Sequence, residues 1–277
     1  MNTIHPIKFG LIGAGNMGGT ILKAAIHKGC VRACDAIVYD VATVQTDKMA
    51  AEFPELTIAE SNVQLAEQAD CILVGVKPVF MAKVLREIAA VVKGKAVISI
   101  AAGWSMDMLN NALGENHGAM LLRVMPNTPA LVGEGYTALC EETSLSSDWL
   151  EWAKELFNCL GESAMVSERL FDAVIAVTGS SPAYIYTLID AMALGGVQQG
   201  MPRAMAQRAA AQAVLGAAKM VLETGEHPCK LRDDVCSPAG TTIAAVDVLK
   251  NTGFESSIMA AMAAAAERNR EMTGKKG

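Results

Sequence analysis

The sequence lacks clusters of metal ligands and clusters of basic residues. Only four histidines occur among its 277 residues, and none has metal-ligand spacing to another histidine or to a cysteine, so we expect no metal site. The net charge is -6, and no run of lysine and arginine appears before Lys275-Lys276. These absences argue against nucleic acid as a partner.

The sequence also lacks the patterns of an exported or membrane protein. Its seven cysteines are odd in number and include no C-x-x-C pair, so we expect reduced thiols in or near the core. Residues 1–6 show no signal-peptide pattern. Pro182, Asp190 and several hydroxyl residues interrupt the long apolar stretch 173–201, which indicates a buried or interface helix and not a membrane span. We therefore expect a cytoplasmic protein without membrane contact.

Short apolar runs alternate with helical segments over the first 166 residues. The runs expected to form strands are 7–12, 36–39, 57–59, 71–76, 96–100, 120–124, 136–140 and 163–166. Such alternation predicts a doubly wound parallel sheet with right-handed connections. Beyond residue 168 we expect only helices, at 171–194, 202–223, 241–250 and 255–272. Their many small residues allow close helix packing, and we expect this part to pack against a second copy of itself.

A glycine-rich turn joins the first expected strand to the first expected helix. Gly13, Gly15 and Gly18 form the pattern G-x-G-x-x-G there. These glycines permit a tight turn, close approach of a pyrophosphate and close packing of helix on strand. The helix N-terminus, with Asn16 and Met17, offers free N–H groups to the phosphates. A glycine-rich turn without a ligand is the alternative.

These patterns predict an α/β fold in two domains. Residues 1–164 are expected to form a Rossmann-like, doubly wound, dinucleotide-binding domain. Residues 165–277 are expected to form an all-helical domain for dimerisation and substrate binding.

Asp40 ends the second expected strand, about 20 residues after the glycine motif. A carboxylate at this place accepts hydrogen bonds from the adenosine ribose and repels a 2′-phosphate, so Asp40 favours NADH. Thr43 and Thr46 could nevertheless contact a phosphate. The alternative is that Asp40 caps a helix or faces solvent.

Further coenzyme contacts are expected where other strands end, since ligands gather at the carboxyl ends of parallel strands. Ala101, Ala102 and Gly103 are small enough to leave room for a flat nicotinamide, which Asn127 and Thr128 could orient. Val76, Lys77 and Pro78 follow another strand in the same way. Ordinary loop chemistry is the alternative at each of these places.

The segment 170–202 contains no lysine, arginine or histidine. Oxidation of an alcohol needs a base, so this absence argues against a hydroxyacid dehydrogenase. A protonated imine arrives already activated and needs no such base. Later in the chain, the turn 236–242 precedes a helix, and its N–H groups and threonine hydroxyls suit a carboxylate. A helix start with its own side-chain cap is the alternative.

Together these stretches resemble the pyrroline-5-carboxylate reductase family over essentially the whole chain. The matching segments are 10–18, 76–78, 123–129, 179–184, 225–228 and 237–242, which read GLIGAGNMG, VKP, RVMPNTP, GSSPAY, GEHP and SPAGTT. The last segment is similar to the family's characteristic motif. It departs from that motif at Ala239, where a second glycine is common, and the alanine could stiffen the loop.

The resemblance implies NAD(P)H-dependent reduction of 1-pyrroline-5-carboxylate to L-proline, the final step of proline biosynthesis, by direct hydride transfer to the cyclic imine. It implies that the substrate carboxylate is held by Ser237, Gly240, Thr241 and Thr242, and that the Thr242 hydroxyl lies near the ring nitrogen as the catalytic group. It adds Asn62 to the expected coenzyme contacts. It also implies a homodimer or a higher oligomer of dimers, in which one chain's nucleotide domain could work with another chain's substrate loop.

The choice of coenzyme stays open on the sequence alone. The family commonly uses NADPH, whereas Asp40 argues for acceptance of NADH. Two other functions remain as alternatives: a hydroxyacid dehydrogenase on the same fold, and a dinucleotide-sensing or scaffold protein without turnover.

Overall fold

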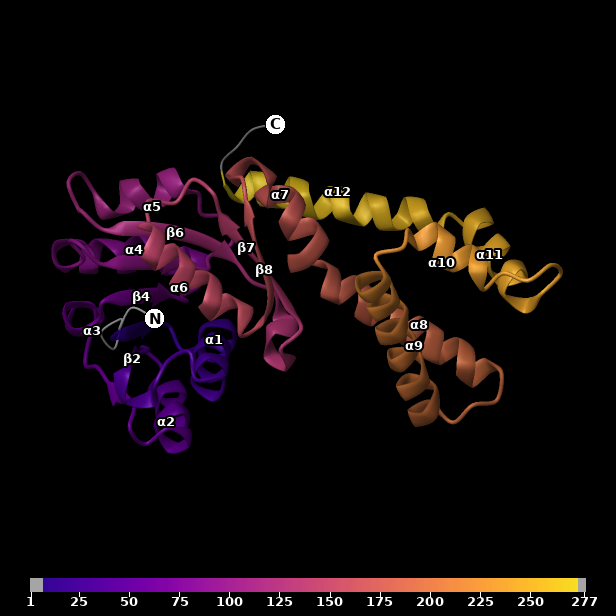
Figure 1. Cartoon of the computed structure of the whole chain (residues 1–277), viewed down its shortest axis with the longest axis horizontal. Coiled ribbons are helices and arrows are strands. Elements are labelled where there is room, and N and C mark those ends of the chain that lie inside the picture. Colours follow the sequence, from indigo (N-terminus) through magenta and orange to yellow (C-terminus); the bar gives the residue numbers. More distant parts are fainter. Residues whose placement is uncertain (1–6, 274–277) are drawn as a thin grey trace. The chain divides into compact units, whose positions relative to one another are not determined.

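The structure is a computed structural model that describes residues 7–273, and it contains two compact units (Figure 1). The sheet unit consists of the described residues up to Gly179 together with those from Ala265 onward. The helical unit consists of residues Ser180–Ala264. An α/β part followed by helices is therefore confirmed, whereas the functional boundary after residue 164 stays a prediction.

The sheet unit is built on eight strands in the order β3-β2-β1-β4-β5-β6-β7-β8. Strands β1 to β6 pair in parallel, β7 runs antiparallel to β6, and β8 is parallel to β7. The expected parallel sheet does not hold at β7, because only a short 3-10 helix, Thr128–Val132, connects it to β6. The strand bounds are β1 Phe9–Ile12, β2 Ala36–Tyr39, β3 Thr57–Ile58, β4 Cys71–Val74, β5 Ala96–Ser99, β6 Met120–Met125, β7 Gly135–Cys140 and β8 Gly161–Val166.

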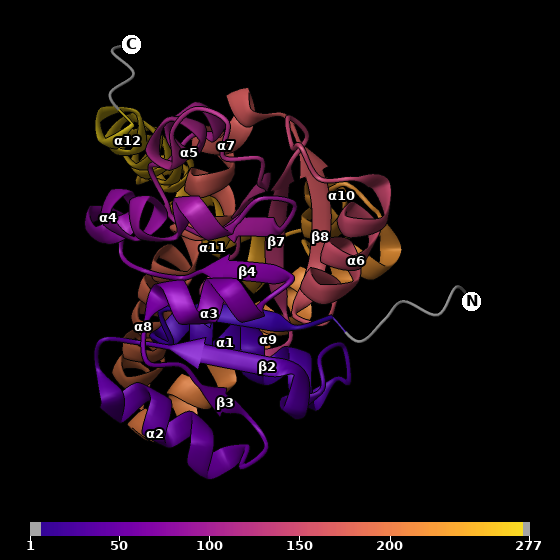
Figure 2. The ribbon, with the colours of Figure 1, turned by 90° about the vertical axis from the view of Figure 1, so that its left-hand side faces the viewer.

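Helices cover both faces of this sheet (Figure 2). Helices α1, α2 and α6 share one buried cluster with the strands, and α3, α4 and α5 share the other. The order of β3-β2-β1-β4-β5-β6 reverses between β1 and β4, where dinucleotides bind in such sheets. The helix bounds are α1 Asn16–His27, α2 Thr43–Glu52, α3 Asn62–Gln68, α4 Pro78–Ile88, α5 Met106–Leu113 and α6 Ser147–Asn158.

Two of the seven cysteines form a disulfide, contrary to the expectation from sequence. The sulfur atoms of Cys30 and Cys159 are 2.03 Å apart, although 129 residues separate the two positions. Cys30 follows α1 and Cys159 follows α6, and these helices lie on the same face of the sheet. The expectation holds for Cys71 and Cys140, which are buried free thiols. Burial raises the pKa of the Cys140 thiol to about 12.

The helical unit is held together by small side chains. Helices α8 and α9 pack through the buried residues Ala193, Ala206 and Ala210, as the alanine-rich sequence predicts. A methyl group added at Gly196 would lie 3.1 Å from the Cβ of Ala206, so the two backbones approach closely. The bounds are α8 Ser181–Gln198, α9 Arg203–Thr224, α10 Pro228–Asp234, α11 Thr241–Asn251 and α12 Phe254–Met272.

The helix expected over residues 171–194 is interrupted. Helix α7 (Phe171–Val174) is followed by a π-helical turn (Ile175–Gly179) before α8 begins at Ser181. Pro182 stands in the first turn of α8, where a residue without an N–H is tolerated. The short helix α10 was not predicted.

The last turns of α12 belong to the sheet unit. Asn269 is 3% exposed there, and its side-chain nitrogen donates a 2.6 Å hydrogen bond to Asp172. Arg270 lies 3.7 Å from the second carboxylate oxygen of Asp172. Among residues 7–273, no helix is both long and apolar enough to cross a membrane.

Candidate active site

The glycine-rich turn has the geometry of a phosphate site. Gly13 has a φ of +93°, and a methyl group on it would lie 2.8 Å from the carbonyl carbon of Gly75. A methyl group on Gly18 would lie 2.3 Å from the carbonyl oxygen of Gly13, so α1 can pack here only with glycine. Nothing lies within 4 Å of the same position at Gly15, which leaves room for a ligand. Helix α1 begins at Asn16 with no side-chain cap and no acidic residue in its first turn, so its N–H groups stay available.

Asp40 links the end of β2 to the glycine-rich turn. One carboxylate oxygen accepts a 2.7 Å hydrogen bond from the backbone N–H of Ala14, and the other accepts a 2.8 Å bond from that of Ala42. Each oxygen keeps a second lone pair, so Asp40 can hold the turn and still accept a ligand hydroxyl. Thr46 is buried and donates its hydroxyl to the carbonyl of Thr43, so Thr46 is not placed to contact a phosphate.

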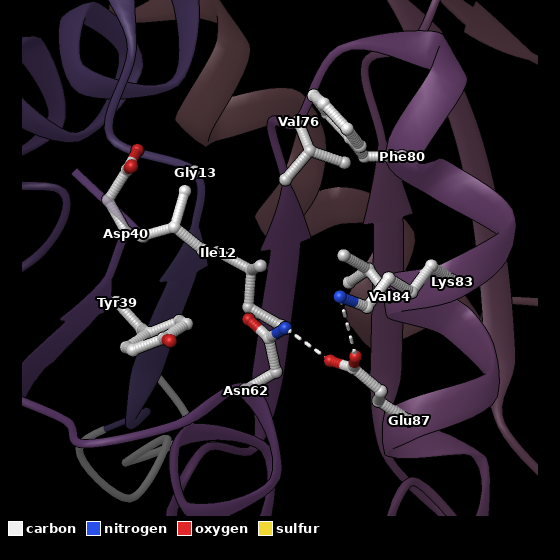
Figure 3. A pocket seen from close by; sticks show the side chains of 11 residues that line it. Ile12, Gly13, Tyr39, Asp40, Asn62, Val76, Phe80, Lys83, Val84 and Glu87 are labelled. Carbon is white, nitrogen blue, oxygen red and sulfur yellow. Dashed lines mark hydrogen bonds and ion pairs between the residues drawn. The ribbon is translucent and has the colours of Figure 1, made fainter.

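A pocket of about 230 Å³ opens beside Asp40 at the carboxyl ends of β1, β2 and β4 (Figure 3). It brings together four of the predicted coenzyme residues, Gly13, Asp40, Asn62 and Val76. Three further polar or aromatic residues, all from α4, were missed in the sequence. Their spacing along one face of α4 is the signal that could have found them. The lining residues are Ile12, Gly13, Tyr39, Asp40, Val41, Asn62, Val76, Phe80, Lys83, Val84 and Glu87.

Asn62 lies in this pocket as the first residue of α3. The cap of α3 is instead Ser61, whose hydroxyl accepts a 3.1 Å bond from the N–H of Gln64. The side-chain nitrogen of Asn62 donates a 2.7 Å bond to Glu87. The side-chain oxygen of Asn62 is buried without a hydrogen-bond partner in the part of the chain that the structure describes.

The loops after β4 and β5 lie at the next strand ends. Ala101 is buried and Ala102 is half-buried, as expected for small residues beside a flat ligand. Lys77 is exposed and immediately precedes α4, which begins at Pro78. The carbonyl of Pro78 accepts a 3.1 Å bond from the ring N–H of Trp104, so the two loops are tied together.

Asn127 ties the loop after β6 to neighbouring segments. Its side-chain nitrogen donates a 3.0 Å bond to the carbonyl of Thr178, and its oxygen accepts a 2.9 Å bond from the N–H of Tyr136. These bonds commit most of the amide to the protein, whereas the next residue, Thr128, is exposed. The contacts support a role for Asn127 in shaping the loop, and its direct contact with a coenzyme stays a prediction.

The predicted substrate residues lie in the helical unit at the start of α11. The N–H of Gly240 donates a 3.0 Å bond to the carbonyl of Ser237 and closes the turn. Ala239 has a φ of +57°, where glycine is favoured, so the alanine both stiffens and strains the turn. Helix α11 begins at Thr241 with Gly240 as its cap residue and no side-chain cap, which does not fit the alternative of a self-capped helix start. Its first N–H groups stay available, close in sequence to the half-buried Thr242.

Comparison with known proteins identifies the family of this chain. The pyrroline-5-carboxylate reductase of Escherichia coli (strain K12) is 45% identical over 269 residues, which cover 96% of this chain and 98% of that protein. The chain belongs to the pyrroline-5-carboxylate reductase family. A family model for pyrroline-5-carboxylate reductase dimerisation matches residues 168–272, and a model described as NADP oxidoreductase coenzyme F420-dependent matches residues 8–103. The resemblance inferred from sequence is therefore confirmed.

Solved pyrroline-5-carboxylate reductases agree with this structure over its full length. The protein from Coxiella burnetii has a TM-score of 0.89 at 29% identity and covers 97% of this chain and 99% of its own. The Plasmodium falciparum pyrroline carboxylate reductase, solved with NADP bound, has a TM-score of 0.88 at 28% identity and covers 98% and 99%. This chain is thus a nicotinamide-dependent oxidoreductase, as the sequence predicted. The roles of its individual site residues stay predictions.

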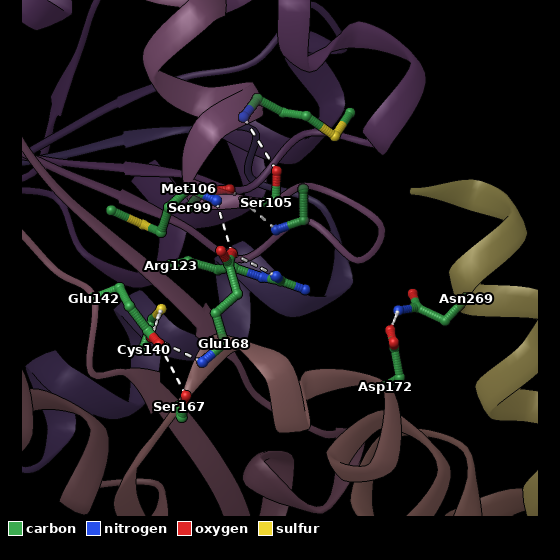
Figure 4. Close-up of polar contacts among 12 residues, drawn as sticks. Ser99, Ser105, Met106, Arg123, Cys140, Glu142, Ser167, Glu168, Asp172 and Asn269 are labelled. Atoms are coloured by element: carbon green, nitrogen blue, oxygen red, sulfur yellow. Dashed lines mark hydrogen bonds and ion pairs between the residues drawn. The ribbon is translucent and has the colours of Figure 1, made fainter. Parts of the chain in front are cut away.

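In this member of the pyrroline-5-carboxylate reductase family, a buried ion pair connects the bases of two predicted coenzyme loops (Figure 4). Arg123 in β6 is 2% exposed and donates a 2.7 Å bond to Glu168. Its guanidinium lies 4.1 Å from the ring centroid of Phe171. The same Glu168 oxygen accepts a 2.7 Å bond from the N–H of Met106, at the start of α5. Sequence analysis did not single out this pair; an arginine within the apolar run 120–124 was the available signal.

Glu142 extends the network from the surface. Its carboxylate accepts a 2.8 Å bond from the backbone N–H of Glu168 and a 2.8 Å bond from the hydroxyl of Ser167. These hydrogen bonds, with the backbone bond foremost, lower the pKa of Glu142 to about 2.

We expect Glu142 to make stability depend on pH. Because its pKa is lower in the folded chain than its ordinary value of 4.5, its contribution is present above about pH 4.5 and is lost as the pH falls to about 2. Glu142→Gln should lower the melting temperature at neutral pH and flatten its pH dependence across that window. Melting curves over a pH series check this, with Glu141→Gln as the neighbouring control. Equal pH profiles for wild type and Glu142→Gln would contradict the expectation.

Proposed function

We propose that this chain reduces 1-pyrroline-5-carboxylate to L-proline, the final step of proline biosynthesis, with NADPH or NADH as the hydride donor. Within its family, the observation that carries this proposal is a pair of helix N-termini without side-chain caps. One, at Gly15, suits a pyrophosphate, and the other, at Gly240, suits a carboxylate. No metal is needed for this chemistry.

The coenzyme site that we propose lies in the sheet unit. The open space at Gly15 and the unpartnered oxygen of Asn62 both fit a dinucleotide with hydroxyl and amino donors. When bound, the reduced coenzyme supplies the hydride for the imine carbon. The residues proposed to hold it are Gly13, Gly15, Asn16, Met17 and Gly18 at the pyrophosphate, Asp40 and Asn62 at the adenosine, and Val76, Lys77, Pro78, Ala101, Ala102, Asn127 and Thr128 towards the nicotinamide.

The substrate site that we propose is the turn Ser237–Thr242. The free N–H groups of Gly240, Thr241 and Thr242, together with the Ser237 hydroxyl, hold the carboxylate. The Thr242 hydroxyl accepts a hydrogen bond from the protonated ring nitrogen and so stabilises the cationic imine in its reactive position. Because that nitrogen already carries its proton, addition of hydride to the carbon completes the amine. No side-chain base is required, in agreement with the absence of lysine, arginine and histidine from residues 170–202.

Parallel assays test this function. Purified protein with 1-pyrroline-5-carboxylate should consume both reduced coenzymes, followed as loss of nicotinamide absorbance, and should form proline. Hydroxyacids with oxidised coenzyme should give no turnover. Turnover of hydroxyacids alone would favour the dehydrogenase alternative, and binding of coenzyme without any turnover would favour the sensor alternative.

We propose that Asp40 makes NADH the better coenzyme. Its carboxylate faces the place of the adenosine ribose and repels a 2′-phosphate, and a like-charge contact of this kind costs several kcal/mol. Asp40→Asn keeps the size of the side chain and removes its charge, and it should raise kcat/KM for NADPH relative to NADH by about tenfold or more. Asp47→Asn on the exposed face of α2 is the control. An unchanged ratio in Asp40→Asn would contradict this role.

We propose a homodimer or a higher oligomer of dimers, formed through the helical unit. This unit matches the dimerisation family model and exposes large apolar side chains, which include Tyr186, Met192, Leu194, Met205, Leu215, Met220 and Leu222. Light scattering should therefore give at least twice the chain mass of 29.1 kDa, and a monomeric mass would contradict the proposal. Dependence on reduced coenzyme agrees with the cytoplasmic location expected from sequence.

A further inference from the structure

The side-chain amide of Asn62 is held in one orientation by its neighbour. Asn62 is 9% exposed, and its nitrogen donates a 2.7 Å bond to one carboxylate oxygen of Glu87. A carboxylate only accepts hydrogen bonds, so the opposite orientation would set the Asn62 oxygen against a Glu87 oxygen. Glu87 therefore decides which atom of Asn62 is left for a ligand.

Glu87 is itself held in place. It lies on α4, which is anchored to the sheet by the buried residues Val84 and Ile88. Its second carboxylate oxygen lies 3.8 Å from the ammonium group of Lys83. The Asn62 amide is thus presented by a fixed partner on a packed helix.

The atom left for a ligand is a buried acceptor. The Asn62 oxygen has no hydrogen-bond partner among residues 7–273, although burying an unpaired acceptor costs about 1–3 kcal/mol. The oxygen lines the pocket described above, so a ligand that enters the pocket can supply the missing donor. A ligand with an acceptor at the same place would meet like against like.

The position of Asn62 in the pocket indicates which part of a dinucleotide brings that donor. Asp40 stands beside Gly13 and the glycine-rich turn, where the ribose is expected, whereas Asn62 lies beyond Ile12, towards Glu87 (Figure 3). The walls that remain are largely apolar and suit a flat ring: Ile12, Val76, Phe80 and Val84. An adenine in that space offers one strong donor, its exocyclic amino group.

We propose that Glu87 is a positioning residue that orients Asn62 to accept a hydrogen bond from the adenine amino group, which makes the site selective for adenine over 6-oxopurines. This inference rests on the proposed coenzyme site and adds a specificity for the base. Hypoxanthine carries an oxygen where adenine carries the amino group, so it cannot satisfy the Asn62 oxygen. A ribose hydroxyl is the other donor that a dinucleotide could offer here.

Binding of nucleoside diphosphates to the full chain tests the inference without turnover. Calorimetry should give a dissociation constant for IDP about tenfold above that for ADP, as expected for one unsatisfied buried acceptor. In Glu87→Gln the amide at position 87 can face Asn62 in either orientation, so both bases can be accommodated and the ratio should fall towards one. Lys83→Gln keeps the bond between Asn62 and Glu87 and should keep the ratio.

Further arms separate the remaining explanations. Asn62→Leu removes the acceptor and should also abolish the preference for ADP, which covers the case in which Glu87→Gln does not fold. Equal binding of ADP and IDP by the wild type would overturn the inference while leaving the coenzyme site in place. A preference lost with 2′-deoxy-ADP and not with IDP would assign the donor to the ribose and overturn it as well. Failure of ADP to bind at all would remove the proposed adenosine site itself.

Discussion

Replacement of Thr242 by alanine is expected to lower kcat for 1-pyrroline-5-carboxylate about 100-fold, while the dissociation constant of the dinucleotide stays near that of the wild type. Removing one preorganised polar group that acts on the reacting centre costs about 100-fold to 1000-fold in other enzymes. Thr242 stands in the first turn of α11, directly after the turn that we propose holds the substrate carboxylate. The dinucleotide contacts that we propose all lie in the sheet unit, so its affinity should not change.

The matched control for this prediction is Thr242→Ser. Serine keeps the hydroxyl and loses only a methyl group, so it should retain most of the turnover. Steady-state kinetics with saturating coenzyme and fluorescence titration of the reduced coenzyme measure the two quantities separately. Equal loss of turnover and coenzyme affinity in Thr242→Ala would mean that Thr242 serves the structure and not the reaction.

Replacement of Glu168 by alanine is expected to lower the free energy of unfolding by about 3–5 kcal/mol, the cost of leaving one member of a buried ion pair without its partner. Arg123 is 2% exposed and would keep its charge in the core, where one of its guanidinium nitrogens already has no hydrogen-bond partner in the described part of the chain. The N–H of Met106 would lose its acceptor as well. Urea denaturation at a fixed protein concentration measures the change.

A surface pair of the same length provides the control. Lys154 and Glu151 also lie 2.7 Å apart, but the side chain of Glu151 is 68% exposed. Glu151→Ala should therefore cost only about 0–1 kcal/mol. The double variant Arg123→Met with Glu168→Leu removes both charges and should recover much of the loss. A cost for Glu168→Ala no larger than that for Glu151→Ala would contradict the role assigned to the pair.

The fold was predictable where a local pattern determines it. The strand Ala36–Tyr39 and the helix Asn62–Gln68 begin and end at the predicted residues, because apolar runs and helical spacing are visible in a short window. The reversal of β7, the π-helical turn Ile175–Gly179 and the disulfide between Cys30 and Cys159 were not predictable. Each depends on segments that meet only after the chain has folded.

The candidate site divides in the same way. The glycine motif and Asp40 follow the first two strands, so their place in the sheet could be inferred from spacing. Glu87 is 25 residues from Asn62, and Glu168 is 45 residues from Arg123, so no local pattern links either pair. The structure was needed to place these partners together.

The sheet unit is discontinuous along the chain, since its last helical turns return from beyond the helical unit. A gene fragment that stops after Gly179 would encode every strand but would leave Asp172 without the 2.6 Å bond from Asn269. It would also uncover Gly103, beside which Met272 packs. Exchange of nucleotide-binding modules between relatives therefore requires two crossover points, one on each side of residues 180–264, and an affinity tag is better placed at the N-terminus than directly after α12.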